Sequence, residues 1–292
     1  MPQVWAWAPW RIRKIKKYVD HVLCKLPFEV DWFNKRGCNA TYVGHPYFDQ
    51  MHTQTYDEAV VERFADKQPL VVLLPGSRNS EVKLTMPILL RAAEKINAQV
   101  PSAKFAMACY SEAHAADAQQ AVDDSGAECD VAYEVTQELM KASDVCVACS
   151  GSVSLELMFH RKPTVILYKL GKVIWFLKAI LFRCKYITLT NLIASDNIER
   201  TDWRNIDPDS EKGAAMVMPE YLTTSDCSEK VANRVITWLN DPAQIQSNAE
   251  KLDSMAKKYA KPGATRRAAE YILNSLASKS HRQDNMAASK AA

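Results

Sequence analysis

The stretch that decides the fold is LVVLLPGSRNSE, residues 70–81. Its first five residues are all aliphatic, and an apolar run without polar alternation predicts a strand buried on both faces, as in parallel sheets. Pro75 and Gly76 interrupt the run, and residues 81–97 then carry apolar side chains at helical spacing. A buried strand, a short glycine turn and a helix form the repeating unit of parallel α/β sheets.

The same alternation continues along the middle of the chain. Further strand-like runs occur at residues 104–109, 131–133, 145–149 and 164–168. Helical patterns follow them at residues 112–123, 137–142 and 153–159. More helical patterns come later, at residues 226–239, 242–259 and 264–276. The sequence therefore predicts an α/β fold, a doubly wound parallel sheet followed by a helical C-terminus.

The two ends of the chain read differently. Within residues 1–55, strand-like Val22–Leu26 and Ala40–Val43 flank a helical pattern. Two or three strands do not close a core by themselves, so we interpret residues 1–55 as the remnant of a domain whose beginning is absent from the sequence. Residues 278–292 are small and polar, and we expect them to form a disordered tail.

Composition excludes several classes of protein. Lys and Arg number 37 and Asp and Glu 34, so the formal net charge of +3 requires no polyanionic partner such as nucleic acid. No apolar run approaches the roughly 18–20 residues that cross a bilayer. The eight cysteines are scattered, mostly in apolar surroundings, which predicts reduced thiols in the cytoplasm and no metal site.

The turn after residues 70–74 is the first candidate binding site. Ligands of open α/β sheets bind at the carboxyl ends of the strands. Gly76 lets the backbone approach an anion, Ser77 adds a hydroxyl donor, and Arg78 adds a cationic fork suited to phosphate oxygens. The alternative is structural, with the serine capping the helix and the arginine forming a surface ion pair.

A second turn of the same kind follows the strand-like run 145–149. Ser150, Gly151 and Ser152 are small residues before a helical pattern, and Glu156 lies four positions after Ser152, on the same helix face. Glu156 could accept hydrogen bonds from ribose hydroxyls. Alternatively, the roles are structural: Ser152 caps the helix, and the helix dipole stabilises the negative charge of Glu156 in the first turn. Two such turns in one sheet favour a nucleotide ligand that carries a diphosphate.

Several strings occur in a fixed order along the chain. They are VWAW (4–7), LPFE (26–29), VGHP (43–46), LLPGSRNSE (73–81) and SGSVSLE (150–156). In that order they resemble the lipid-A-disaccharide synthase family, which comprises inverting, metal-independent glycosyltransferases built from two Rossmann-like domains (the GT-B type). NLIA (191–194) and PEYL (219–222) are similar to two further family strings near the donor site. The resemblance extends from residue 3 to about residue 277.

The resemblance implies a domain plan and an activity. Residues 1–55 would be the remnant of the acceptor domain, and residues 56–277 the UDP-sugar donor domain, in whose pocket Asn191 and Glu220 would lie. The reaction would join UDP-2,3-diacylglucosamine to 2,3-diacylglucosamine 1-phosphate, giving lipid A disaccharide 1-phosphate and UDP without a metal or cofactor. The family's candidate base precedes Val4, so no catalytic residue is assigned.

Other functions remain open at this point. The chain could be an inactive UDP-sugar-binding fragment, or another GT-B transferase or epimerase that uses UDP-N-acetylglucosamine. The acylated substrates of the family imply a cytoplasmic enzyme peripheral to the inner membrane of Gram-negative bacteria. One departure from the family is the polar stretch 195–218, which is longer than usual and is expected to form a surface loop near the donor site.

Two segments are candidates for membrane contact. Residues 11–17 contain five basic side chains, typical of a solvated helix face or of attraction to an anionic membrane surface. Residues 173–183 read VIWFLKAILFR, which fits either a buried helix or a helix lying in the membrane interface. In the second case Trp175, Phe176 and Lys178 would meet the lipid.

Overall fold

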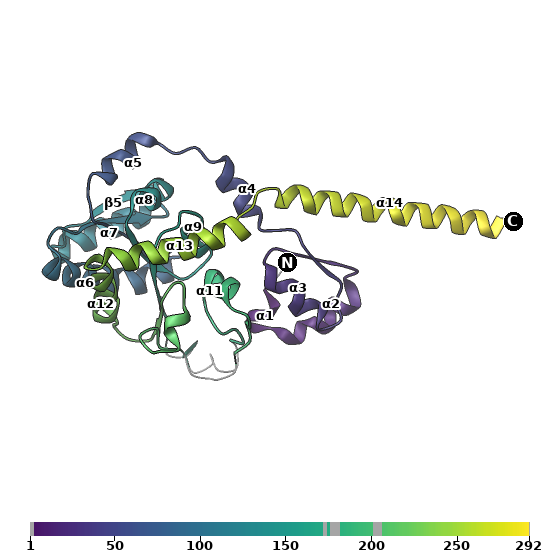
Figure 1. The fold of residues 1–292 in the computed structure, drawn as a ribbon, viewed down its shortest axis with the longest axis horizontal. Helices are drawn as coiled ribbons and strands as arrows, with labels where there is room; N and C mark the ends of the chain where they lie inside the picture. Colours follow the sequence, from purple (N-terminus) through teal and green to yellow (C-terminus); the bar gives the residue numbers. More distant parts are fainter. Residues whose placement is uncertain (1–2, 172–173, 176–181, 201–205, 292) are drawn as a thin grey trace. The chain divides into compact units, whose positions relative to one another are not determined.

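A computed structural model of the chain describes residues 3–171, 174–175, 182–200 and 206–291. The chain divides into two units (Figure 1). The central unit is Thr55–Lys257, and the terminal unit combines Met1–Gln54 with Lys258–Ala292. Both are α/β with parallel strands, which confirms the predicted fold class.

The central unit contains a parallel sheet of six strands. They are β3 (Leu70–Leu74), β4 (Lys104–Cys109), β5 (Asp130–Tyr133), β6 (Val145–Cys149), β7 (Thr164–Lys169) and β8 (Glu220–Thr223). Their order across the sheet is β5-β4-β3-β6-β7-β8. Numbered within the unit this is 3-2-1-4-5-6, the Rossmann order, in which the direction of winding reverses between β3 and β6.

The central unit also contains a series of helical elements. They are α5 (Glu58–Ala65), α6 (Asn79–Gln99), α7 (Glu112–Ser125), α8 (Thr136–Ala142), α9 (Val153–Phe159), α11 (Leu189–Ala194), η2 (Gly213–Ala215), α12 (Ser228–Leu239) and α13 (Pro242–Tyr259). All five residues of β3 are buried, as expected for a strand covered on both sides. Helices α6 and α12 pack together through buried side chains that include Ile88, Leu89 and Val235. Each such side chain contributes about 1.5–3 kcal/mol.

The structure contains elements that the sequence patterns did not predict. The main one is strand β8. It was not predicted because its four residues begin with the charged Glu220 and contain no apolar run. It forms by pairing with β7, in the register Ile166 to Glu220. Helices α5 and α11 were also not predicted; α5 is amphipathic, and its N-cap residue Asp57 accepts from the N–H of Ala59.

The terminal unit contains a small parallel β-α-β arrangement. Strands β1 (Val22–Cys24) and β2 (Ala40–Tyr42) pair, and α3 (Pro27–Asn34) connects them, as predicted. The other helices are α1 (Val4–Trp7), η1 (Pro9–Arg11), α2 (Ile12–Tyr18), α4 (Pro46–Thr53) and α14 (Ala264–Ala291). Buried Glu29 accepts from the N–H of Leu26 (3.0 Å) and from Trp5 Nε1 (2.9 Å), so one carboxylate joins α1 to α3.

Helix α14 differs from the predicted plan in two ways. It groups with the N-terminal residues, whereas the domain prediction placed residues up to 277 with the donor domain. Asp49 on α4 explains this grouping, because its carboxylate accepts from the N–H groups of Gly263, Ala264 and Thr265 (2.6, 3.0 and 2.8 Å) and so caps α14.

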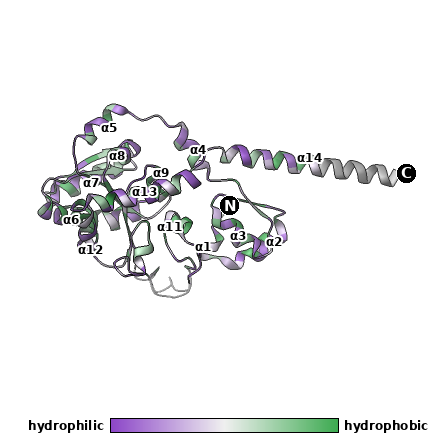
Figure 2. Cartoon of the chain, in the orientation of Figure 1, coloured by the Kyte–Doolittle hydropathy of each residue, from purple (hydrophilic) through white to green (hydrophobic). Residues whose placement is uncertain are grey.

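The second difference concerns the end of the chain. Residues 278–292 were expected to be a disordered tail, but α14 continues through Ala291. The tail is rich in alanine, which has the highest helix propensity. Hydrophilic and hydrophobic residues alternate along the coloured part of α14 (Figure 2).

Candidate functional site

The two predicted turns lie side by side at the point where the strand order reverses. Strands β3 and β6 are neighbours, with Leu74 opposite Ala148, so the turns that follow them leave the same edge of the sheet. A Cβ added at Gly76 would lie 3.5 Å from the Cβ of Cys149. In open α/β sheets this reversal point, outside the carboxyl ends of the strands, is where ligands bind.

Glycine is required at position 76. Its φ of +116° lies in a region that other residues rarely adopt, and a Cβ there would come within 3.1 Å of the Cβ of Glu81. Thr85 donates to the carbonyl of Pro75 at 2.6 Å and ties the turn to the second helical turn of α6. The backbone of the first turn is therefore tightly specified.

The N-terminus of α6 presents unused donors. Its N-cap residue is Arg78, and within the described residues no side chain caps this helix. The predicted alternative, in which Ser77 caps the helix, is wrong, because the helix begins one residue too late for it. The N–H groups of Glu81 and Val82 point to the carbonyl of Arg78, while those of Asn79 and Ser80 precede the first helical bonds and can meet an anion.

Arg78 lies at the surface beside this turn. Its side chain is 75% exposed, and Nη1 donates to Glu81 Oε1. The hydrogen bond and the charge of Glu81 both raise the pKa of Arg78. The ion pair of the structural alternative is thus present. A guanidinium has five N–H donors, so this bond still leaves donors for a phosphate.

The second turn is open to solvent. Gly151 and Ser152 are exposed, and a Cβ added at Gly151 would meet no atom within 4 Å. Ser150 Oγ donates to the carbonyl of Ile187 at 3.4 Å. Ser152 is the N-cap residue of α9 but makes no side-chain cap bond, which corrects the structural alternative. Its backbone is helical (φ −62°, ψ −21°), whereas capping by a hydroxyl needs an extended N-cap residue.

Glu156 lies on α9, behind this turn, and is 8% exposed. Its Oε2 accepts a hydrogen bond from Gln137 Nε2 on α8. Gln137 Oε1 lies 2.8 Å from His160 Nε2, one helical turn beyond Glu156. Burial, followed by the charges of Lys162 and Lys141, lowers the pKa of His160 to about 4. The spacing of Glu156 and His160 places both on one helix face, but no local signal predicts the contact with Gln137.

Glu220, predicted to line the donor pocket, is the centre of a buried network and is 6% exposed. Its carboxylate accepts from the N–H of Ile187 (2.8 Å), the N–H of Thr188 (2.9 Å), Thr188 Oγ1 and Asn191 Nδ2 (2.8 Å). Burial raises the pKa of Glu220, and these hydrogen bonds act in the opposite direction. The network joins β8, the edge strand of the sheet, to the segment that precedes α11.

Asn191 is 1% exposed and uses both ends of its amide within the protein. Its Nδ2 donates to the carbonyl of Met218 (2.7 Å), and its Oδ1 accepts from the N–H groups of Val217 and Met218 (2.9 and 3.0 Å). Thr190 on the same helix donates to the carbonyl of Ser154 at 2.7 Å, which links α11 to α9. Helix α11 therefore supports the second turn from behind, and direct contact of Asn191 or Glu220 with a ligand stays a prediction.

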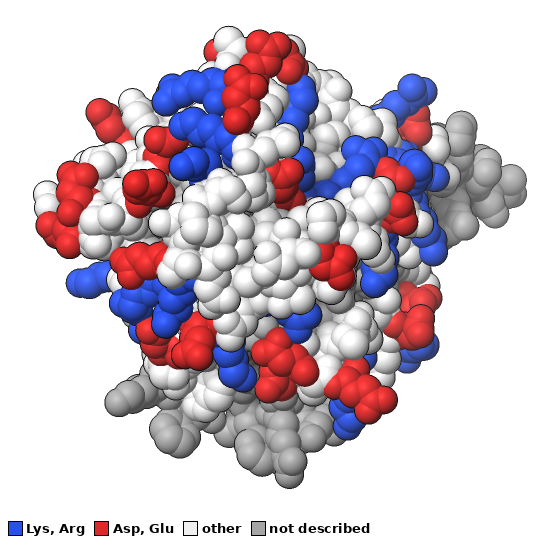
Figure 3. Space-filling view, turned by 60° about the vertical axis from the view of Figure 1, so that its left-hand side comes forward, with Lys and Arg blue, Asp and Glu red and all other residues white. Residues whose placement is uncertain are grey.

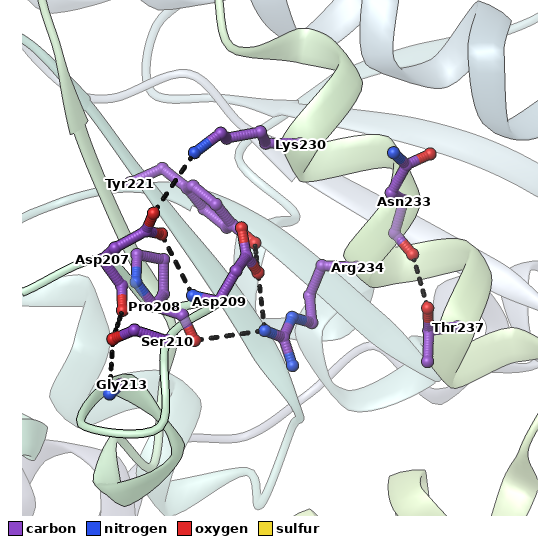
Figure 4. A network of polar contacts seen from close by, with 10 residues as sticks. All are labelled: Asp207, Pro208, Asp209, Ser210, Gly213, Tyr221, Lys230, Asn233, Arg234 and Thr237. Carbon is purple, nitrogen blue, oxygen red and sulfur yellow. Dashed lines mark hydrogen bonds and ion pairs between the residues drawn. The ribbon is translucent and has the colours of Figure 1, made fainter.

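The polar stretch 195–218 is anchored to α12 where the structure describes it. Asp209 Oδ1 accepts from Arg234 Nη2 (2.7 Å) and from the hydroxyl of Tyr221 (2.8 Å), as Figure 4 shows. Gly213 permits the tight turn, since a Cβ there would lie 2.3 Å from the carbonyl oxygen of Asp207. Beside this network, the start of α12 and the end of β8 line a polar cavity of about 770 Å³.

Two of the three residues predicted for membrane contact, Phe176 and Lys178, lie outside the described residues. Trp175 is half-buried, and its neighbour Ile174 is 47% exposed. Among the helices that the structure describes, none is both long and apolar enough to cross a membrane. Positive and negative side chains intermix over the face drawn in Figure 3, in keeping with the net charge of +3.

Comparisons with known proteins give one consistent result. The sequence profile of the family described as lipid-A-disaccharide synthetase matches residues 1–261. A lipid-A-disaccharide synthase from Idiomarina loihiensis is 35% identical over 202 residues, which cover 68% of this chain and 53% of that protein. The one from Trichlorobacter lovleyi is 29% identical over 275 residues, covering 94% of this chain and 67% of that protein.

The chain thus spans about half to two thirds of the length of these relatives. Among solved structures, a putative UDP-N-acetylglucosamine 2-epimerase from Listeria monocytogenes matches with a TM-score of 0.53 at 13% identity. That match covers 87% of this chain and 59% of the other, and it shows a shared fold alone. Since the family profile covers most of the sequence, the chain belongs to the lipid-A-disaccharide synthetase family.

Proposed function

We propose that the central unit binds the UDP part of a sugar donor, and that the chain serves the transfer of 2,3-diacylglucosamine from UDP to 2,3-diacylglucosamine 1-phosphate. The observation that carries this proposal is the pair of turns after β3 and β6, adjacent at the point where the strand order reverses. Family membership supports the synthesis of a lipid A disaccharide as the reaction.

The two turns would together hold the diphosphate of the nucleotide. The N–H groups of Asn79 and Ser80 and the guanidinium of Arg78 would hold the diphosphate, and Ser77 and the turn Ser150–Ser152 would add donors. Glu156 would accept from the ribose hydroxyls.

In the reaction, an acceptor hydroxyl attacks the anomeric carbon, the bond from that carbon to the diphosphate oxygen breaks, and UDP leaves. Donors aimed at the diphosphate stabilise the negative charge that grows on it.

We assign no general base to a described residue. Inversion requires a base within hydrogen-bond reach of the attacking hydroxyl. The carboxylate of Glu29 is buried and bonded to the backbone of Leu26 and to Trp5, and that of Asp49 caps α14. Neither is arranged to take a proton from a substrate.

The experiment that tests the proposal measures binding and turnover separately. Calorimetry of the purified chain with UDP is expected to show saturable binding, and lack of binding would contradict the donor-site assignment. Mass spectrometry then follows product from UDP-2,3-diacylglucosamine and its acceptor. Binding without product would favour the inactive fragment, and turnover of UDP-N-acetylglucosamine without an acyl requirement would favour another enzyme of the GT-B type.

We also propose that the terminal unit attaches to anionic lipid through the surface formed by the end of α1, η1 and α2. Trp7 and Trp10 are 57% and 60% exposed. The five cations Arg11, Arg13, Lys14, Lys16 and Lys17 are exposed beside them. Exposed tryptophans next to basic side chains suit the headgroup region of an anionic bilayer.

Sedimentation with vesicles tests this attachment. The chain should bind phosphatidylglycerol vesicles more than phosphatidylcholine vesicles, and Trp7→Ser together with Trp10→Ser should release it without lowering its melting temperature. The variant Trp175→Ser tests the second predicted contact in the same assay. A loss of stability without loss of vesicle binding would assign Trp175 to packing rather than to lipid.

A further inference from the structure

Gln137 occupies an unusual position between two ionisable side chains of one helix. It lies in the first turn of α8 and contacts Glu156 on α9 and His160, the C-cap residue of the same helix, four positions later. Neither the two turns nor the family strings explain this contact. It joins the predicted ribose-binding carboxylate to an imidazole that has no other role in the site.

The chemistry of the three groups orients the glutamine amide in one way. Gln137 Nε2 donates to Glu156 Oε2, so Gln137 Oε1 is the atom that faces His160. An amide oxygen has no proton to give, and His160 Nε2 must therefore carry the hydrogen of the 2.8 Å bond. Protons thus point from His160 to Gln137 and from Gln137 to Glu156.

The surroundings keep the imidazole in this state. The ring of Tyr56 lies 5.8 Å from that of His160 at 71°, and Lys141 Nζ lies over the Tyr56 ring at 4.8 Å. Burial and the charges of Lys162, Lys141 and Arg161 lower the pKa of His160 to about 4. The ring is neutral at physiological pH, and its single proton lies on Nε2.

We propose that Gln137, held by His160, is a positioning residue that fixes the carboxylate of Glu156 for the ribose hydroxyls of a nucleotide. This inference rests on the proposed donor site. A carboxylate offers roughly four acceptor positions, so a bond from Gln137 and a bond from a ribose hydroxyl can coexist. The glutamine specifies which way the oxygens face, and the imidazole prevents the amide from turning over.

The alternative is that Gln137 only joins α8 to α9. The two roles differ in a measurable way, because pyrophosphate has no ribose. Calorimetry with UDP and with pyrophosphate on the full chain separates them. The variant Gln137→Met keeps the length of the side chain and removes both amide groups. It should weaken the binding of UDP by about fivefold to tenfold, which corresponds to the loss of one hydrogen bond, and leave the affinity for pyrophosphate unchanged.

Two further variants make the result specific. Gln119→Met is the matched control, since Gln119 on α7 is bonded to Asp123 at the surface (2.8 Å), and it should change neither affinity. In a chain that already carries Glu156→Gln, adding Gln137→Met should cost little more UDP affinity, because the group that it positions has been altered.

A second route protects the test against misfolding. His160→Phe keeps a ring against Tyr56 and removes the donor, so it should reproduce a smaller, UDP-selective loss if Gln137→Met fails to fold. Equal losses for UDP and pyrophosphate, or no loss in either variant, would overturn the positioning role. If the wild-type chain bound UDP no more tightly than pyrophosphate, that result would instead contradict the proposed nucleotide site.

Discussion

Two polar regions of the central unit, which lie two strands apart in the sheet, are built in opposite ways. At the turns after β3 and β6, helix N-termini lack side-chain caps within the described residues, and Ser77, Gly151 and Ser152 face solvent. Around Glu220 and Asn191, buried donors and acceptors bond one another. The open region has donors to offer a ligand, whereas the closed region holds the structure behind it.

The closed region should give the largest effect on stability. Glu220→Ala would remove the acceptor of the N–H groups of Ile187 and Thr188 and of one N–H of the Asn191 amide. We expect the free energy of unfolding, measured with urea, to fall by about 3–5 kcal/mol. Glu220→Gln retains one acceptor oxygen and should cost clearly less. If both variants kept wild-type stability, the distinction between the two regions would be lost.

The open region should affect binding and leave stability unchanged. Arg78→Ala is expected to weaken UDP by about 1.5–3 kcal/mol, as for the loss of a charge-assisted hydrogen bond, with no change in the urea midpoint. Arg91→Ala is the matched control, because Arg91 lies on the same helix and pairs with Asp226 at 2.9 Å. Unchanged UDP affinity in Arg78→Ala would contradict the assignment of the first turn.

His160 should contribute less to the free energy of unfolding than Glu220 does, and its contribution should depend on pH. Its folded pKa of about 4 lies below the ordinary value of 6.5, so between these pH values the unfolded chain binds more protons. Its contribution to stability is present above pH 6.5 and is lost as the pH falls towards 4. Between pH 7 and pH 5 the wild type should lose about 1–2 kcal/mol more than His160→Phe. Equal losses in urea titrations would show that His160 is not held neutral.

The smallest expected effect distinguishes nucleotide from phosphate. Glu156→Gln should weaken UDP by about 1 kcal/mol and leave pyrophosphate almost unchanged, since only UDP offers a ribose to the carboxylate. Calorimetry with both ligands provides the measurement. The same loss of affinity for both ligands would show that Glu156 does not bind the ribose and has a structural role in α9.

Local patterns in the sequence predicted those features that depend on nearest neighbours. The aliphatic runs of β3 and β6 and the glycine turns after them were found because burial on both faces leaves no polar alternation. The spacing of apolar residues likewise predicted α6 and α12. Strand β8 escaped detection, because it forms through pairing with β7 and begins with a charged residue.

What the tertiary structure alone decided was which distant residues meet. The order β5-β4-β3-β6-β7-β8 brings together turns 75 residues apart in sequence, by the numbers of Gly76 and Gly151. Gln137 reaches Glu156 across 19 residues, and Asp49 caps a helix that begins more than 200 residues later. A sequence period reports which face of an element is buried, but the partner that covers it depends on packing and hydrogen bonds between segments, which no local pattern encodes.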